Sequence, residues 1–277
     1  MLTEKNQIQI HGIDFLKIES GLTTVGTDKG GWVYASNRPK HEVSIPEYFI
    51  TKSVLSAQQL SNLIPELNSL DEGLDFTGID KDVREQIIGK FADIIDQGYE
   101  VRAPSIGEWK RAHDLGMIST SPNNVEVLAD SAFSNFRGAH MDGSPRLESM
   151  IGPLSSQKAG LQVHPRNQNE FATSAVPQDR RLRNTSLRLV ISPKREVPTP
   201  KVPNNSDFAK NVRTELLCTL FIGIIPSFLI PVLRGFGSYA TEGWANLLFG
   251  GIVAGFVTGA VWRPRRPTVK IEDAIKE

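Results

Sequence analysis

Cysteine is almost absent from this chain of 277 residues, which contains a single one, Cys218. Without a second cysteine no disulfide can form within the chain, and the first 200 residues carry no thiol for catalysis or metal binding. A net charge is also absent, because 31 basic residues balance 31 acidic ones. A strongly basic surface, the usual footprint of nucleic-acid binding, is therefore not expected, and no nucleic-acid partner is predicted.

Common signatures of nucleotide-binding and hydrolytic enzymes are missing as well. The chain has no glycine-rich phosphate loop, no Gly-x-Ser-x-Gly elbow and no His-Glu-x-x-His motif. Its five histidines show no close spacing suited to a metal, and no EF-hand-like acidic loop is present. The segment Met1–Phe15 contains no apolar core of signal-peptide length, so export by that route is not expected.

Ionisable side chains are missing from two apolar runs near the C-terminus, Leu216–Leu233 and Trp244–Trp262. As helices rising about 1.5 Å per residue they would reach about 27 and 28 Å, close to the roughly 30 Å of a bilayer's hydrocarbon core. Lys and Arg are in excess over 194–213 and after Trp262, whereas the connecting loop is neutral. The sequence therefore predicts a two-helix transmembrane hairpin with a basic tail over 214–277, in the inner membrane, with both termini cytoplasmic.

Small residues recur every fourth position in the second run, at Gly251, Gly255 and Gly259. Such a face lets two helices approach closely. Its neighbour is either the first helix of the hairpin or a second copy of the protein, so both a plain anchor and self-association remain open. Pro226 and Pro231 are expected to kink the first helix.

Residues 1–193 are predicted to form a soluble α+β domain, and the proline-rich residues 194–213 a stiff linker that spaces it from the membrane. Helices are expected at Ala57–Leu63, at Lys81–Gln97 and from Ser105 to about Leu115. Short strands are expected over 10–55, at Tyr99–Val101 and at Leu187–Ile191. Residues 117–185 show little apolar periodicity and are expected to be irregular loops packed down by scattered apolar side chains.

Four short motifs follow one another between residues 13 and 193. They are Phe15-x-x-Ile18-x-x-Gly21 with Gly26, Pro39-x-His41-x-Val43 leading into Tyr48-Phe49-Ile50-Thr51-Lys52 and Val54, Tyr99-Glu-Val-Arg102-Ala-Pro104-Ser105-x-x-Glu108-Trp109, and Leu187-Arg188-Leu189-Val190. Together they resemble the formylglycine-generating enzyme, or sulfatase-modifying factor, family. The third is similar to the family's Tyr-Arg-Leu-Pro-Thr-x-x-Glu-Trp. The resemblance implies a C-type-lectin-like α+β fold with two helices, small twisted sheets and much irregular loop.

The third motif can also be interpreted without the family. Ser105 and Glu108 form a capping box, and Trp109 in the first helical turn can pack inward. A structural corner is the main interpretation, and a ligand-binding role for Arg102 or Glu108 is the alternative. The motif residues are Arg102, Pro104, Ser105, Glu108 and Trp109.

The chain departs from the family where its chemistry is concentrated. The oxidase members bind copper through a late cysteine pair, and residues 117–193 contain no cysteine. Other members hold iron on histidines of an additional helical domain that this chain lacks. The domain is therefore predicted to be a non-catalytic member, a pseudoenzyme without a cofactor. Calcium enters only through the resemblance, because relatives of the fold often carry it.

Two polar clusters are the predicted ligand-binding surfaces, with ordinary solvated surface as the alternative for each. One is the loop Phe136–Arg146, whose turns can hold polar side chains in place. The other is a cationic cluster that could meet a phosphate, an acidic partner or lipid headgroups. The residues are Arg137, His140, Asp142, Arg146, Arg180, Arg181 and Arg183.

The function predicted from the sequence is a membrane-anchored, non-enzymatic recognition or sensor module at the cytoplasmic face of the membrane. Its expected partners are the lipid bilayer and either another protein or a second copy bound through the glycine face. Two alternatives remain: an accessory structural subunit of a larger membrane complex, and an enzyme of the same superfamily with an unrecognised site within 134–184.

Overall fold

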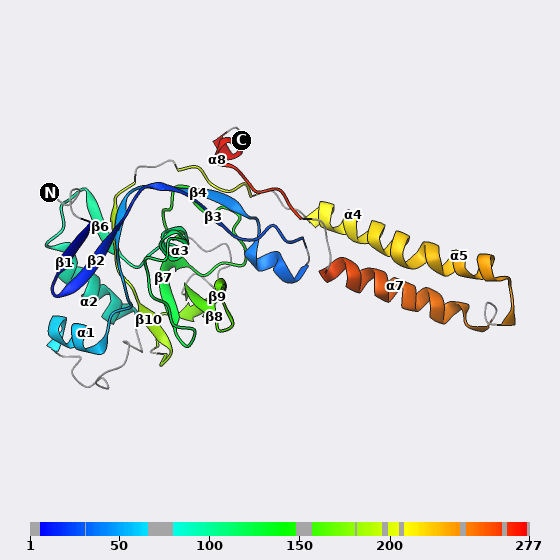
Figure 1. Ribbon diagram of the computed structural model, residues 1–277, viewed down its shortest axis with the longest axis horizontal. Coiled ribbons are helices and arrows are strands. Elements are labelled where there is room, and N and C mark those ends of the chain that lie inside the picture. The colour runs from blue at the N-terminus through cyan, green and yellow to red at the C-terminus, as the bar shows by residue number, and fades with distance from the viewer. Residues whose placement is uncertain are drawn as a thin grey trace.

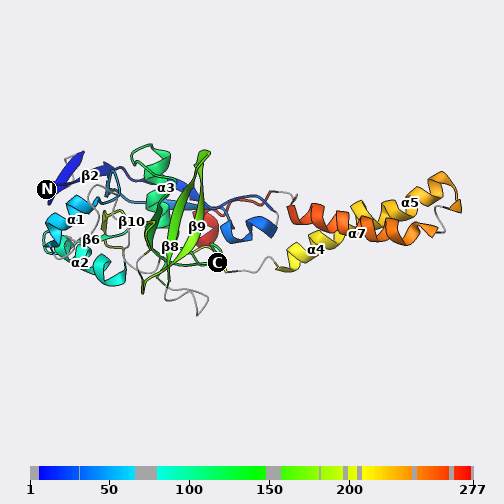
Figure 2. The same cartoon turned by 90° about the horizontal axis from the view of Figure 1, so that it is seen from below.

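The structure is a computed structural model that describes residues 6–30, 32–65, 80–147, 157–180, 182–195, 199–204, 208–238, 242–261 and 265–275. These residues form a mixed α+β body and a long helical hairpin that projects from one end of it (Figure 1). The view turned by 90° shows the same elongated arrangement (Figure 2). The predicted α+β class is confirmed for the body.

The first sheet brings the two ends of the soluble sequence together. Its order is β1 (Gln7–Ile10), β2 (Ile13–Ile18), β5 (Tyr48–Thr51), β11 (Val190–Pro193) and β6 (Tyr99–Arg102). Neighbouring strands are antiparallel throughout. All four residues of the central strand β5 are buried, as expected for a strand covered on both faces. A separate two-stranded antiparallel sheet joins β3 (Gly21–Val25) to β4 (His41–Ile45).

A four-stranded sheet lies where the sequence predicted irregular loops. Its order is β10 (Thr185–Leu187), β7 (Val125–Ser131), β8 (Gln157–His164) and β9 (Asn167–Pro177). The prediction of loops over 117–185 is therefore wrong for these strands. β7 is buried at every position, including Glu126 and Asp130, so it shows no alternation of apolar and polar residues. β9 carries small, largely exposed side chains such as Ala172 and Ser174, which also gives no periodic signal.

The helices of the body follow their predicted starts. α1 (Ala57–Leu63) begins with a capping box between Ser56 and Gln59, and α3 (Ile106–Asp114) with one between Ser105 and Glu108. α2 (Lys81–Ala92) ends before the predicted Gln97, because the chain turns there to enter β6. A short 3-10 helix, η1 (Trp32–Asn37), follows β3.

The five-stranded sheet separates two apolar cores, since successive residues of a strand face opposite sides. On β5, Tyr48 and Ile50 belong to the core that contains Trp109, whereas Phe49 belongs to the core that contains Phe91. Trp109 is fully buried, which confirms the predicted inward packing of the third motif.

The first leg of the hairpin is a continuous helical rod of α4 (Phe208–Cys218), a π-helical segment η4 (Thr219–Ile224) and α5 (Ile225–Arg234). The π-helical segment ends just before Pro226, which cannot donate an N–H and crowds the preceding turn. The second leg is α7 (Trp244–Val261), and it runs beside the first (Figure 1). Pro231 leaves the carbonyl of Ser227 without its usual helical donor. The indole Nε1 of Trp244 donates to that oxygen at 3.2 Å and ties the two legs together.

The glycine face packs inside the hairpin. A Cβ built on Gly251 would lie 2.7 Å from the carbonyl oxygen of Gly223, and one on Gly255 would lie 2.8 Å from the Cα of Thr219. The sequence left open whether the glycine face packs on the first helix of the hairpin or on a second copy. Gly251 and Gly255 face the first helix of the same chain. Gly259 lies in the last turn of α7, and its surroundings are outside the described residues.

One helical stretch, Val212–Arg234, is by length and composition able to cross a membrane. A buried core helix can have the same length and composition, but only 17% of the most apolar 18 residues of this stretch is buried within the protein. The other leg counts as a shorter apolar helix over Trp244–Val257. Of the two spans predicted at 216–233 and 244–262, the first thus has this support, and the second stays a prediction.

Candidate functional site

The strand-to-helix corner of the third motif is built around a buried carboxylate. Glu108 is fully buried, and Arg102 donates to it through both terminal nitrogens, at 2.6 and 2.9 Å. The backbone N–H of Ser105 donates to the same carboxylate at 2.9 Å, which completes the capping box. Burial alone would raise the pKa of Glu108, but the charge and hydrogen bonds of Arg102, with Arg195 and Ser105, lower that pKa to about 2. The corner is therefore a permanently charged structural pair.

The corner also holds the point where the chain leaves the sheet. Arg195, two residues after β11, donates to Glu108 at 3.1 Å and to Ser192 Oγ at 3.3 Å. Ser105 Oγ donates to the carbonyl of Gly143 at 2.7 Å. The motif residues Arg102, Ser105 and Glu108 thus fix the start of the predicted linker and one end of the Phe136–Arg146 loop.

A second carboxylate, Asp130 on β7, organises the same region and was missed by the sequence analysis. It accepts the backbone N–H groups of Ile106 at 2.8 Å and Arg146 at 2.7 Å. Burial raises its pKa, although these two hydrogen bonds oppose that shift. The only signal in the sequence is that two acidic residues, Glu126 and Asp130, stand within a short apolar stretch.

A third buried carboxylate, Glu126, was also missed. It accepts the indole N–H of Trp109 at 2.9 Å and two N–H groups of Arg188, at 2.8 and 3.0 Å. The Arg188 guanidinium is fully buried, and it also donates to the carbonyls of Thr51, Lys52 and Ser119. Arg188 of the fourth motif therefore joins the five-stranded and the four-stranded sheet through hydrogen bonds and an ion pair with Glu126.

The predicted binding loop Phe136–Arg146 is engaged by the chain itself. Arg137 donates to the carbonyl of Pro203 at 3.1 Å, and His140 Nδ1 contacts the hydroxyl of Thr199. Asp142 accepts both the N–H and the hydroxyl of Ser144. Arg146 donates to the carbonyl of Asn135 at 3.2 Å. Arg137 and His140 therefore fasten the loop to residues 199–204, whereas Asp142 and Arg146 bond to residues of the loop or next to it.

We call residues 199–204 the strap. Gly138 donates to the carbonyl of Val202 at 2.9 Å, Val202 donates back to Ala139, and Met141 donates to Pro200. Val202 itself is buried in the core that contains Trp109. The prediction of a stiff linker that spaces the domain from the membrane over 194–213 thus differs from the structure at 199–204, because Val202 and the main chain around it dock on the domain.

The other leg of the hairpin returns to the same place. Val269 donates to the carbonyl of Lys40 and accepts the N–H of Glu42, so the tail pairs with β4. α8 (Ile271–Ile275) packs against the core beside β4. On that edge of β4, Ser44 also donates to Met141 of the loop at 2.8 Å. The Phe136–Arg146 loop, which binds the strap, therefore bonds to the same edge of β4 as the tail that follows α7.

The cationic cluster lies elsewhere. Arg180 and Arg183 are exposed in the turn between β9 and β10, and Arg180 pairs with Asp179 at 3.7 Å. Arg181 is outside the described residues. The structure does not bring this cluster together with the Phe136–Arg146 loop, which connects β7 to β8.

Comparison with known proteins supports the fold. The chain is similar to the structure of PvdO from Pseudomonas aeruginosa, with a TM-score of 0.52 and 14% sequence identity over 66% of this chain and 96% of PvdO. A looser likeness is to the Treponema denticola variable protein 1, at a TM-score of 0.43 and 10% identity over 68% of this chain and 98% of that protein. No family model and no curated protein matches the sequence. At this identity, the likeness to PvdO shows a shared fold and carries no activity.

The chemistry open to the described residues is limited. Among them no group of three or more His, Cys, Asp or Glu side chains is arranged to hold a metal ion. The concavities of the body are small and polar. One of about 270 Å³ is lined by residues such as Asp14, Lys52 and Gln59, and another of about 150 Å³ by Ser119, Thr120 and Glu126. The most extensive set of contacts described in the body is instead the junction where the Phe136–Arg146 loop, the strap and the tail after α7 meet.

Proposed function

We propose that this protein is a membrane-anchored, non-enzymatic recognition or sensor module of the sulfatase-modifying-factor type. Its soluble domain lies at the cytoplasmic face of the inner membrane, and both legs of the hairpin cross the bilayer. The soluble domain recognises a partner, and the junction of loop, strap and tail transmits that event to the hairpin.

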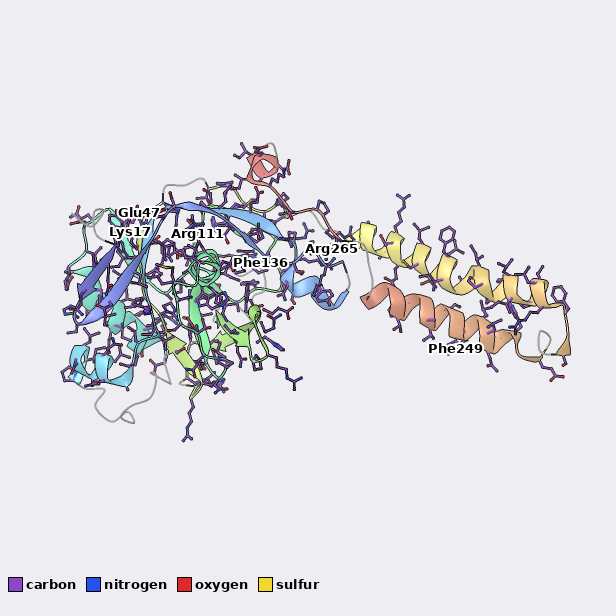
Figure 3. The ribbon with its side chains drawn as sticks, viewed as in Figure 1. Lys17, Glu47, Arg111, Phe136, Phe249 and Arg265 are labelled. Atoms are coloured by element: carbon purple, nitrogen blue, oxygen red, sulfur yellow. The ribbon has the colours of Figure 1, made fainter. Side chains whose placement is uncertain are left out.

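The observation that carries the proposal is the exposed apolar surface of the hairpin. Large apolar side chains project outward along both legs, for example Phe221 at 63% and Phe249 at 70% exposure. Figure 3 labels Phe249 on the outside of α7. An apolar surface of this extent is unfavourable in water and marks an interaction site, and lipid satisfies it without a specific partner. The 18 residues of α7 reach about 27 Å, which supports a second crossing.

Recognition is preferred to catalysis because the buried ionisable groups of the domain have structural partners. Glu108 is paired with Arg102 and Arg195, and Glu126 with Arg188. A group already fixed by several strong hydrogen bonds is a poor proton donor or acceptor for a substrate. The loop is better placed to respond to a partner, since its backbone is bonded directly to the strap.

Membrane integration is tested by alkaline carbonate extraction of the full chain. We expect the wild type in the pellet, and the double variant Phe221→Arg/Phe249→Arg in the supernatant, because a charged side chain near the centre of a transmembrane helix costs about 2.5–3.5 kcal/mol. Leu22→Arg is the matched control, since Leu22 is 63% exposed on the body. Extraction of the wild type into the supernatant would refute the anchor.

Topology is tested with sealed spheroplasts. Protease added outside should leave the soluble domain intact, and its digestion would overturn the cytoplasmic orientation.

An accessory-subunit role is favoured by one observation. An apolar groove of about 410 Å³ runs between the two legs and is lined by residues including Leu216, Thr219 and Phe256. A transmembrane helix of another subunit could fill it. Purification in mild detergent separates the two functions: a partner present in fixed stoichiometry with every copy supports the subunit role, and a chain that purifies alone supports the sensor.

A further inference from the structure

Three cations stand where the apolar surface of the hairpin begins. Lys29 belongs to the loop after β3, Arg213 follows directly on Val212, where the membrane-compatible stretch starts, and Arg265 follows α7. All three residues are exposed. Figure 3 labels Arg265 at the neck between body and hairpin. Chain segments that are far apart in sequence thus carry exposed positive charge next to the end of the hairpin that joins the body.

The backbone that carries two of these cations is fixed, while their charged ends stay open. Arg266 donates its N–H to the carbonyl of Asp28 at 2.7 Å, which ties the end of the hairpin to the loop that contains Lys29. Arg265 is 81% exposed along its side chain and has a long ion pair of 3.4 Å with Asp28. The Nζ of Lys29 lies 4.9 Å from the centre of the Tyr34 ring, a cation–π contact that leaves the ammonium accessible.

An aromatic segment lies at the same level. η1, which contains Tyr34, contacts α7, and both views show it beside the base of that helix (Figures 1 and 2). Trp and Tyr gather at the headgroup level of membrane proteins, because their rings are apolar and their polar tips remain hydrated. The cations and η1 together therefore have the composition of a membrane–water interface on the domain side of the hairpin.

We infer that Lys29, Arg213 and Arg265 form a binding site for the phosphate of an anionic phospholipid headgroup at the base of the hairpin. The inference rests on the proposed membrane anchor. Lipid is the occupant because the site continues directly into the apolar surface, so that a bound headgroup has its acyl chains along the hairpin. Arg and Lys recognise phosphate through charge-assisted hydrogen bonds. Among the described residues, two acids lie close to these cations in the sequence: Asp28, which pairs with Arg265, and Glu215, which is buried, so the three cations remain in excess.

The test is native mass spectrometry of the full chain, purified in detergent and mixed with equal amounts of phosphatidylglycerol and phosphatidylcholine. We expect the wild type to retain phosphatidylglycerol preferentially. The triple variant Lys29→Gln/Arg213→Gln/Arg265→Gln should lose more than about ten-fold of that preference, since each cation near an anionic surface contributes several-fold. Arg265→Lys should keep most of it, because the charge remains.

The matched control is Lys81→Gln/Arg180→Gln/Arg183→Gln, which removes the same charge from exposed positions of the body. Equal losses in both triple variants would overturn the inference, because the preference would then follow net charge alone. Unchanged binding by the first triple variant would also overturn it. Displacement of the lipid by millimolar inorganic phosphate would identify a site for free phosphate and refute a lipid site.

Failure of this inference is distinguishable from failure of the anchor. The first triple variant keeps every apolar residue of the hairpin, so it should remain in the carbonate pellet. If the wild type pellets but shows no preference for phosphatidylglycerol, only the headgroup site is refuted. If the wild type does not pellet, the anchor is refuted, and the lipid preference of the purified chain still decides the headgroup site.

Discussion

The packing between the two legs of the hairpin can be tested at Gly250 and Gly251, because these adjacent glycines have very different surroundings. A Cβ added at Gly251 would lie 2.7 Å from the carbonyl oxygen of Gly223, whereas one added at Gly250 meets nothing within 4 Å. Ordinary contacts of a Cβ begin at 3.4 Å, so Gly251→Ala requires the two legs to separate by several tenths of an ångström or more. Gly250→Ala requires no movement.

The expected energies follow from two opposing effects. Replacing a glycine in a helix by alanine favours the helix by about 1 kcal/mol at either position. Overpacking of a close contact costs about 1–3 kcal/mol, and it applies only at Gly251. Gly250→Ala should therefore stabilise the hairpin by up to about 1 kcal/mol, and the two variants should differ by about 1–3 kcal/mol.

The assay is loss of helical circular dichroism when the full chain, held in mild detergent, is titrated with dodecyl sulfate. Gly251→Ala should unfold at a lower denaturant fraction than Gly250→Ala, and Gly223→Ala should behave like Gly251→Ala because its Cβ would overlap the Gly251 carbonyl. Chemical cross-linking should give the same oligomeric state for all variants. Equal unfolding of the three variants, or loss of a dimer in Gly251→Ala alone, would refute internal packing of the glycine face.

Three further predictions concern buried polar groups. Burial lowers the pKa of His41 to about 4 from 6.5, so the unfolded state binds the proton at a higher pH than the folded state. The free energy of unfolding should therefore be highest above pH 6.5 and fall by about 3 kcal/mol down to pH 4. Urea titrations of His41→Asn should lack this pH dependence. Glu108 keeps its charge to a pKa of about 2 against 4.5, so it adds a second fall between pH 4.5 and 2. Glu108→Gln should remove that second fall and cost about 3–5 kcal/mol at pH 7 in the same titrations, because Arg102 and Arg195 lose their buried carboxylate and only the partly exposed Glu100 still pairs with Arg102. Trp244→Phe leaves the Ser227 carbonyl without its donor and should lower hairpin stability by about 1 kcal/mol in the dodecyl sulfate titration, and an unchanged midpoint would show that water replaces the indole.

The parts of the fold that could be predicted are those encoded locally. The capping boxes at Ser56 and Ser105 involve residues three positions apart, and both helices begin where these boxes place them. Trp109 follows directly on Glu108, so its inward direction could be deduced from the turn alone. A pattern of this kind is visible because all of its partners lie within a few residues.

The four-stranded sheet could not be predicted, because its polar residues have distant partners. Glu126 is buried only because Arg188 lies opposite it, 62 positions along the chain. Asp130 is buried because two backbone N–H groups from other segments point at it. A strand that buries carboxylates in this way has no alternation of apolar and polar residues, and single-sequence periodicity assigns it to loop.

The candidate loop illustrates a different limit. Its Arg, His and Asp side chains suggested a binding surface, and in the structure each of them has a hydrogen-bond partner in the protein itself. Composition does not say whether the partner of such groups is a ligand or another part of the same chain. Here Pro203 and Thr199 of the strap accept or share hydrogen bonds with Arg137 and His140, and only Val202 among the surrounding prolines indicated that the strap could dock.

The docked strap changes how the domain and the hairpin can communicate. A stiff proline-rich spacer would hold the domain away from the membrane without bonding to it. Instead, the loop that carries the strap and the tail after α7 both bond to one edge of β4, through Ser44 and Glu42. We therefore expect a change in the tilt of either leg to strain these main-chain hydrogen bonds or to move β4. Because β4 also carries the buried His41, whose ring centroid lies 5.3 Å from that of Phe136 in the loop, we expect a partner that shifts this loop to act on both legs at once.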